Sequence, residues 1–203
     1  MENGIYDVAV VGAGAAGLMA AIQANRRNLK VLLVDGQQKI GAKILMSGGT
    51  RCNVTNRQVT EKDFASDQIR TVRNILKAFP PEETVRFFEE LGVTLILEEG
   101  GKFFPSTHSG RTILDTFLKE IAKRKIDLKT GRKVREAAFE GGVFLLKGNG
   151  FKEQAKAVVL CTGGLSYPKT GSDGVGYSLA RTFGHHLIPT IPALTPLLLD
   201  DPA

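Results

Sequence analysis

A hydrophobic run at residues 8–11 ends in the glycine-rich residues 12–17. An alanine-rich stretch without proline follows as far as Arg27, and a second apolar run occupies residues 31–34. Apolar runs of strand length on either side of a helical stretch predict a strand, a tight turn, a helix and a second, parallel strand. The pattern at this end of the chain is therefore typical of half of a dinucleotide-binding unit.

The glycines and an acidic residue give this unit its candidate chemistry. Gly12 permits a sharp turn out of the strand, Gly14 lets the backbone approach a pyrophosphate, and Gly17 lets the helix lie close to the sheet. Asp35 ends the second strand, where a carboxylate accepts hydrogen bonds from ribose hydroxyls. The alternative is a βαβ unit that only packs. The cofactor contacts predicted here are Gly12, Gly14, Ala15, Ala16, Gly17, Asp35 and Gly36.

Apolar residues at spacings of three and four predict three more helices. The first covers residues 67–79. The second begins at Pro81 and ends before Gly92, and the third covers residues 110–124. We expect all three to pack against the core, with Phe87 and Phe88 as core residues.

Short alternating segments predict strands between these helices. Residues 93–97 and 102–104 flank a short stretch of acidic and glycine residues, which predicts a hairpin with its turn at residues 98–101. A further strand, an antiparallel meander and a last parallel strand follow, at residues 126–128, 134–139, 142–146, 151–154 and 157–164. The predicted fold class is α/β, a Rossmann-like domain with a parallel sheet and a small antiparallel meander.

Residues 36–56 lack periodicity, and we expect a long loop there. A loop of this length in a compact domain is often functional, although a plain surface loop is the alternative. Its glycines allow backbone N–H groups to converge on a ligand, and Lys43 and Arg51 could neutralise a pyrophosphate. A second glycine-rich segment, residues 166–177, predicts either another anion site or a simple turn and helix cap.

Composition limits the domain organisation. The chain has 203 residues, of which 42% are hydrophobic and none is tryptophan. We predict one domain at residues 1–190, incomplete at its carboxyl end. Four of the eight prolines fall within residues 189–203. This predicts that residues 191–203 begin a linker or second domain that is absent here.

The formal charge is +6, and basic residues concentrate at residues 119–135. No nucleic-acid motif accompanies them, so we expect a solvated surface and no nucleic-acid partner. Cys52 and Cys161 form neither a metal-binding pair nor a disulfide framework, which favours a reducing compartment. With no signal peptide or membrane-spanning run, we predict a cytoplasmic protein without a metal site.

Three further motifs carry a family resemblance. They are residues 41–56, containing Gly41-Ala42-Lys43 and Ser47-Gly48-Gly49-Thr50-Arg51-Cys52-Asn53, the segment Thr162-Gly163-Gly164 with residues 166–172, and Pro192-Ala193-Leu194. Together with the glycine turn, they make nearly the whole chain resemble the bacterial flavoprotein family called BaiN-like or YhiN-like, also labelled aminoacetone-oxidase-like. That family comprises predicted FAD- and NAD(P)-dependent oxidoreductases.

The resemblance implies FAD as the cofactor and NAD(P)H as a candidate co-substrate. It implies that FAD passes electrons between NAD(P)H or a small organic substrate and an acceptor. It also implies a C-terminal half that is missing from this chain, so the alternative is a non-catalytic fragment or one half of a split flavoprotein. The further cofactor contacts that it implies are Lys43, Ser47, Gly48, Gly49, Arg51, Cys52, Asn53, Val134, Thr162, Gly163 and Gly164. It identifies no catalytic residue.

Overall fold

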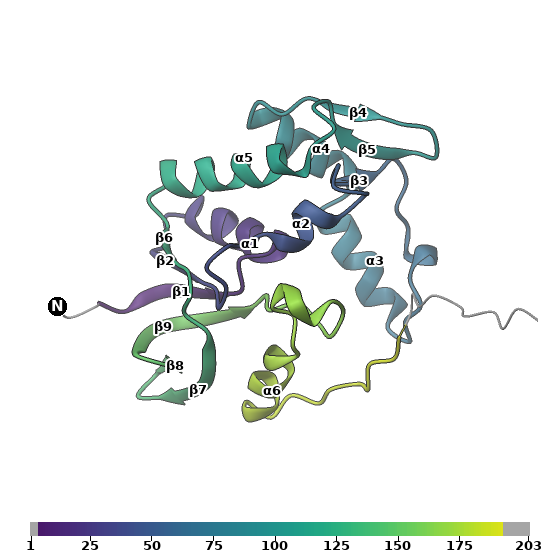
Figure 1. Ribbon diagram of the computed structural model, residues 1–203. Helices are drawn as coiled ribbons and strands as arrows, with labels where there is room; N and C mark the ends of the chain where they lie inside the picture. The colour runs from purple at the N-terminus through teal and green to yellow at the C-terminus, as the bar shows by residue number, and fades with distance from the viewer. Residues whose placement is uncertain (1–3, 193–203) are drawn as a thin grey trace, which may run out of the picture.

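The computed structural model describes residues 4–192, which form an α/β fold around a six-stranded sheet (Figure 1). The strand order is β6-β2-β1-β9-β8-β7. The strands β6, β2, β1 and β9 run parallel, and β8 and β7 are antiparallel. Their bounds are β1 (Tyr6–Val11), β2 (Val31–Val34), β6 (Asp127–Lys129), β7 (Val134–Glu140), β8 (Val143–Gly148) and β9 (Phe151–Leu160).

Helices cover both faces of the sheet (Figure 1). On one face, Leu18 and Ile22 of α1 pack with Phe117 of α5 in the larger core. On the other, Leu179 of α6 packs against Leu146 of β8. Because β1 lies between two strands and two layers, Ala9, Val10 and Val11 are buried whichever face they point to, and Val8 is partly buried. The α-helices are α1 (Ala15–Asn25), α2 (Ala42–Met46), α3 (Ile69–Ala78), α4 (Pro81–Glu90), α5 (Gly110–Lys123) and α6 (Val175–Thr182), and the 3₁₀ turns are η1 (Glu61–Asp63) and η2 (Pro168–Thr170).

A second, three-stranded antiparallel sheet contains the predicted hairpin. Its strands are β3 (Thr55–Asn56), β4 (Leu95–Leu97) and β5 (Lys102–Pro105). The pairing of β4 with β5 around Gly100 and Gly101 confirms the hairpin prediction.

The structure corrects two predictions about element boundaries. The third strand of the meander and the last parallel strand are one strand, β9, whose first half pairs with β8 and whose second half pairs with β1. In addition, the predicted loop at residues 36–56 contains the helix α2. Its Ile44 is buried in the core beside α5, and a helix of 5 residues is too short to produce a detectable period.

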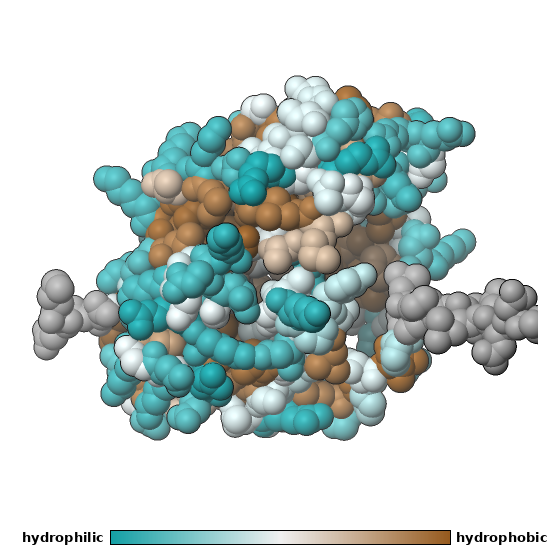
Figure 2. Space-filling model, in the orientation of Figure 1, coloured by the Kyte–Doolittle hydropathy of each residue, from teal (hydrophilic) through white to brown (hydrophobic). Residues whose placement is uncertain are grey.

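The helix α3 also differs from expectation, because none of its residues is buried. Ile75 is 64% exposed and Phe79, which follows the helix, is 40% exposed. By contrast, Phe87 and Phe88 of α4 are core residues, as predicted. Figure 2 shows hydrophobic residues across the middle of one face, at the level of α1, α2 and α3 in Figure 1. The apolar side of α3 is therefore only partly covered by the rest of residues 4–192.

The division at residue 190 stays a prediction, and residues 193–203 lie outside the described residues. Within residues 4–192, no helix combines the length and the apolar character needed to cross a membrane.

Candidate functional site

Two glycines of the turn after β1 are required by the packing of the chain itself. Gly12 has a φ of +104°, and a Cβ added there would lie 2.3 Å from the carbonyl oxygen of Cys161. A Cβ at Gly17 would lie 1.7 Å from the carbonyl oxygen of Gly12. No side chain fits at such distances. Gly12 therefore allows β9 to approach the turn, and Gly17 allows α1 to approach it.

Gly14 differs, because a Cβ there would meet no atom within 4 Å. Gly14 is the N-cap of α1 and has an ordinary negative φ of −81°. The first turn of α1 contains no acidic residue, and Gly14, Ala15 and Ala16 line a cavity, so the unpaired N–H groups and partial positive charge of the helix face that cavity. A glycine that no contact of the folded chain requires, at the N-terminus of a helix without an acidic residue in its first turn, fits a site for a bound phosphate.

Asp35 connects the end of β2 to this turn. Its Oδ2 accepts a hydrogen bond of 2.6 Å from the N–H of Ala13, and its Oδ1 accepts one of 2.7 Å from the N–H of Gln37. Each carboxylate oxygen has two lone pairs, so each can accept a further hydrogen bond from a ligand. Asp35 both holds the turn and lines the adjacent cavity.

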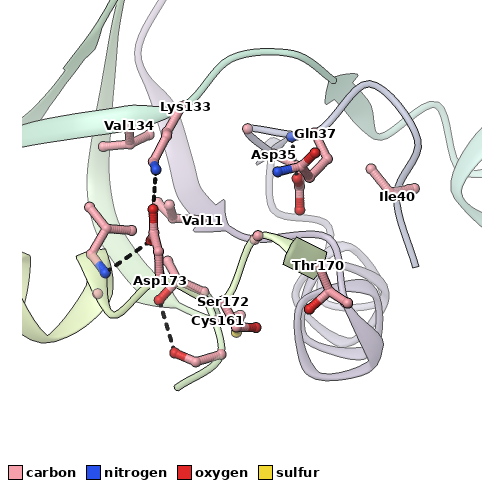
Figure 3. A pocket seen from close by; sticks show the side chains of 18 of the residues that line it. Val11, Asp35, Gln37, Ile40, Lys133, Val134, Cys161, Thr170, Ser172 and Asp173 are labelled. Atoms are coloured by element: carbon pink, nitrogen blue, oxygen red, sulfur yellow. Dashed lines mark hydrogen bonds and ion pairs between the residues drawn. The ribbon is translucent and has the colours of Figure 1, made fainter. Parts of the chain in front are cut away.

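That cavity, of about 680 Å³, lies at the carboxyl ends of β1, β2 and β9. The strands β2 and β9 flank β1 on opposite sides, and open α/β sheets bind ligands at such a reversal of strand order. In Figure 3, Asp35 and Gln37 lie on one side of the cavity, and Lys133 and Asp173 lie on the other. The predicted contacts that line it are Gly12, Gly14, Ala15, Ala16, Asp35, Gly36, Lys43, Val134, Thr162 and Gly163.

Eight predicted contacts stand outside the lining of this cavity: Gly17, Ser47, Gly48, Gly49, Arg51, Cys52, Asn53 and Gly164. Gly17 lies behind the turn, against Gly12. Arg51 donates hydrogen bonds of 2.8 and 2.9 Å to the carboxylate of Glu98, and its guanidinium lies over the ring of Phe104. Arg51 therefore already has an anionic partner. Cofactor contacts by the loop at residues 47–53 stay a prediction.

Sequence reasoning missed several residues that line the cavity, among them Gln37, Lys133 and Asp173. Lys133 forms an ion pair with Asp173, and the hydrogen bond from Lys133 holds the pKa of the Asp173 carboxyl below its ordinary value. The sequence pointed to the glycine-rich segment that contains Asp173, but it could not pair that segment with Lys133, 40 residues away.

Lys43 is held by the same glycine-rich segment. Its Nζ donates hydrogen bonds of 2.7 Å to the hydroxyl of Ser172 and 3.3 Å to that of Ser166. Ser172 is buried, and Lys43 has no carboxylate partner among residues 4–192. The ammonium charge is therefore available to an anion in the cavity.

Cys52 is buried in the larger core, and Cys161 is partly buried against it. Burial raises the pKa of the Cys161 thiol, which lines the cavity, and that of the Cys52 thiol, which does not. A raised pKa keeps a thiol protonated at neutral pH and a poor nucleophile. Cys161 lies against α1, because a Cβ added to Gly17 would lie 3.3 Å from the Cβ of Cys161. Position 161 therefore favours a small side chain.

A family model described as the HI0933-like protein Rossmann domain matches residues 6–192. The chain belongs to the HI0933-like family. This confirms the family resemblance inferred from the motifs, and the predicted Rossmann-like α/β class agrees with the observed sheet.

Two curated relatives match the HI0933-like domain over nearly its whole length. A 3-dehydro-bile acid delta(4,6)-reductase of Clostridium scindens is 34% identical, over 94% of this chain and 47% of that protein. A ribosomal RNA dihydrouridine synthase of Escherichia coli is 32% identical, over 97% of this chain and 49% of that protein. The chain thus spans about half the length of these relatives.

Among solved structures, a flavocytochrome c3 fumarate reductase in an open conformation shares the fold, with a TM-score of 0.61 and 20% identity over 89% of this chain and 40% of that one. Together with the family match, this identifies the fold of the HI0933-like chain as a Rossmann domain of the kind found in that flavoprotein.

Proposed function

We propose that this chain binds the adenosine diphosphate part of FAD in the cavity at the carboxyl ends of β1, β2 and β9. The observation that carries the proposal is the open space in front of Gly14 at the N-terminus of α1. Helix N–H groups and the helix dipole bind phosphate there without any side chain. The uncompensated ammonium of Lys43 adds a positive charge in the same cavity.

The remaining contacts follow from the residues on each wall. Asp35 would accept hydrogen bonds from the ribose hydroxyls, through the lone pairs that the N–H groups of Ala13 and Gln37 leave available. Val134, at the start of β7, lines the cavity and would contact the adenine, and residues 162–163, which also line it, would close it from the end of β9. These residues bind and orient the nucleotide, while the flavin ring, when bound, supplies the transfer of an electron pair between donor and acceptor.

We further propose that oxidoreductase activity requires a second half like that of the curated relatives, and that NAD(P)H is the co-substrate. The names of the relatives describe a delta(4,6)-reductase and a dihydrouridine synthase, which favours reduction of a carbon–carbon double bond as the reaction class. The partly exposed apolar side of α3, with Ile75 and Phe79 at the surface, is where we place the packing of such a second half.

We propose a small organic substrate rather than a nucleic acid. Within the basic residues 119–135, Arg124 pairs with Glu120, Lys129 with Glu153, and Lys133 with Asp173. These cations are therefore partly neutralised within the fold, which weakens their attraction for a phosphate backbone.

Nucleotide titration tests the proposal. Calorimetry of the purified chain with ADP, FAD and FMN should detect binding of ADP and FAD, which share the adenosine diphosphate, and none of FMN, which lacks it. Failure of both ADP and FAD to bind would refute the function. Binding of FAD without any oxidation of NADH or NADPH by the isolated chain would support the alternative of a nucleotide-binding fragment.

A further inference from the structure

One wall of the cavity is a segment whose main chain is not hydrogen-bonded to the main chain of other segments among the described residues. Residues 163–173, here called the strap, run from the end of β9 to α6. Among the described residues, the strap makes hydrogen bonds between main-chain groups only within itself. The N–H of Thr170 donates to the carbonyl oxygen of Tyr167, and the N–H of Gly171 donates to that of Pro168. Strand pairing therefore does not fix the strap in position.

Both ends of the strap contain left-handed residues. Gly163 has a φ of +74° and Gly171 has a φ of +94°, and Gly174, just beyond the strap, has a φ of +81°. Glycine adopts these angles without steric cost and crosses readily between conformations. The strap thus has permissive positions on either side of its 3₁₀ turn.

Side chains from three other segments hold the strap over the cavity. Lys133, just before β7, pairs with Asp173, and Lys43 of α2 donates hydrogen bonds to Ser166 and Ser172. Gln37, after β2, packs on Gly171, where an added Cβ would lie 3.1 Å from the Gln37 side chain. Figure 3 shows Lys133 and Asp173 meeting beside the cavity, opposite Asp35.

We propose that the Lys133 and Asp173 ion pair is a clasp that keeps the strap closed over the adenosine end of the cavity, so that the nucleotide leaves when the clasp opens. Lys133 and Asp173 are thus positioning residues for cofactor retention. The inference rests on the proposed function, because it takes the cavity to hold FAD or ADP.

The experiment compares FAD dissociation rates, followed by the recovery of flavin fluorescence after dilution. The variants are Lys133→Asp, Asp173→Lys and the double charge exchange. The matched control is Lys156→Ala, which breaks the exposed ion pair of 2.7 Å with Asp7 on the β1 and β9 side of the sheet. Circular dichroism verifies that each variant is folded.

Each single variant should release FAD about two- to fivefold faster, the range expected from a partly exposed ion pair. The double exchange should restore the slow rate and the control should match the parent. If the single variants released FAD faster only because the whole fold had become less stable, exchanging the two charges would not restore the slow rate. Unchanged rates in both single variants, with FAD still bound, would overturn the clasp.

Hydrogen exchange of the nucleotide-free chain separates this inference from the proposed function. Opening the clasp should raise amide exchange in residues 163–173 of both single variants and not in the control. If the parent binds neither ADP nor FAD, the proposed function fails. Amide exchange then tests by itself whether the ion pair of Lys133 with Asp173 holds the strap closed. Equal exchange in all variants would then overturn it.

Discussion

The N–H of Ala13 donates a 2.6 Å hydrogen bond to the carboxylate of Asp35, 22 residues further along the chain. This hydrogen bond joins the turn after β1 to the end of β2. The other carboxylate oxygen of Asp35 accepts a hydrogen bond from the N–H of Gln37. The acidic residue expected to bind ribose is therefore also a structural tie.

Asp35→Ala should reduce both stability and nucleotide affinity, because it removes two hydrogen bonds to a charged acceptor. We expect the free energy of unfolding to fall by about 2 kcal/mol in chemical denaturation. The control is Asp67→Ala, at an exposed position before α3. A change of stability as small as that of the control would contradict the structural role.

The glycines of the turn should separate folding from binding. Gly17→Ala places a Cβ 1.7 Å from a carbonyl oxygen and should lower the free energy of unfolding by about 3 kcal/mol or more. Gly14→Val, which extends into open space, should leave the apo chain stable and abolish FAD retention. Lys123→Ala, on the basic helix α5, should change neither. Equal stability losses at Gly14 and Gly17 would refute this division.

Stability should decline on the alkaline side. Burial, together with the hydrogen bond to Asp127, raises the pKa of Tyr6 above its ordinary value of 10.0. Burial opposes a rise at Lys129, but the hydrogen bond to Glu153 and the nearby charges outweigh it, so the pKa of Lys129 is also above its ordinary value.

Since the folded state then holds protons that the unfolded state has lost, the stabilisation is complete below about pH 10 and falls as the pH rises further. Urea denaturation between pH 8 and 11 measures this decline, and Tyr6→Phe should make it shallower. An unchanged slope in Tyr6→Phe would show that Tyr6 does not contribute.

Alkylation of the two cysteines distinguishes a cofactor site limited to the cavity from one that also includes the loop at residues 47–53. Because burial raises both pKa values, iodoacetamide should react slowly with Cys52 and Cys161 at neutral pH. Bound FAD should protect Cys161, which lines the cavity, and leave the rate at Cys52 unchanged. Mass spectrometry measures both rates. Protection of both cysteines would instead place residues 47–53 at the cofactor, as the family motif predicts.

The apolar side of α3 gives a prediction about the second half. Because Ile75 is 64% exposed, Ile75→Asp should change the free energy of unfolding of the isolated chain by less than about 0.5 kcal/mol. It should nevertheless prevent association with a co-expressed second half of the Clostridium scindens relative, whereas Lys77→Ala on the same helix should not. Light scattering that shows a dimer broken by Ile75→Asp would assign the face to a second copy instead.

The sequence by itself determined the βαβ unit and its glycine turn. These rest on contacts close in sequence, such as the approach of Gly17 to Gly12, so the residue pattern carries them directly. The hairpin of β4 and β5 was predictable for the same reason. Local periodicity failed where tertiary contacts define an element, as for α2, which forms where Ile44 packs beside α5.

Only the tertiary structure decided which charged residues face the cavity. Arg51 and Lys43 are equivalent as cations in the motif, yet Glu98 engages Arg51, whereas Lys43 points to two serine hydroxyls beside the cavity. The partners of both lie at least 47 residues away. Sequence spacing does not encode such long-range pairing, because it depends on how separate strands and helices come together in three dimensions.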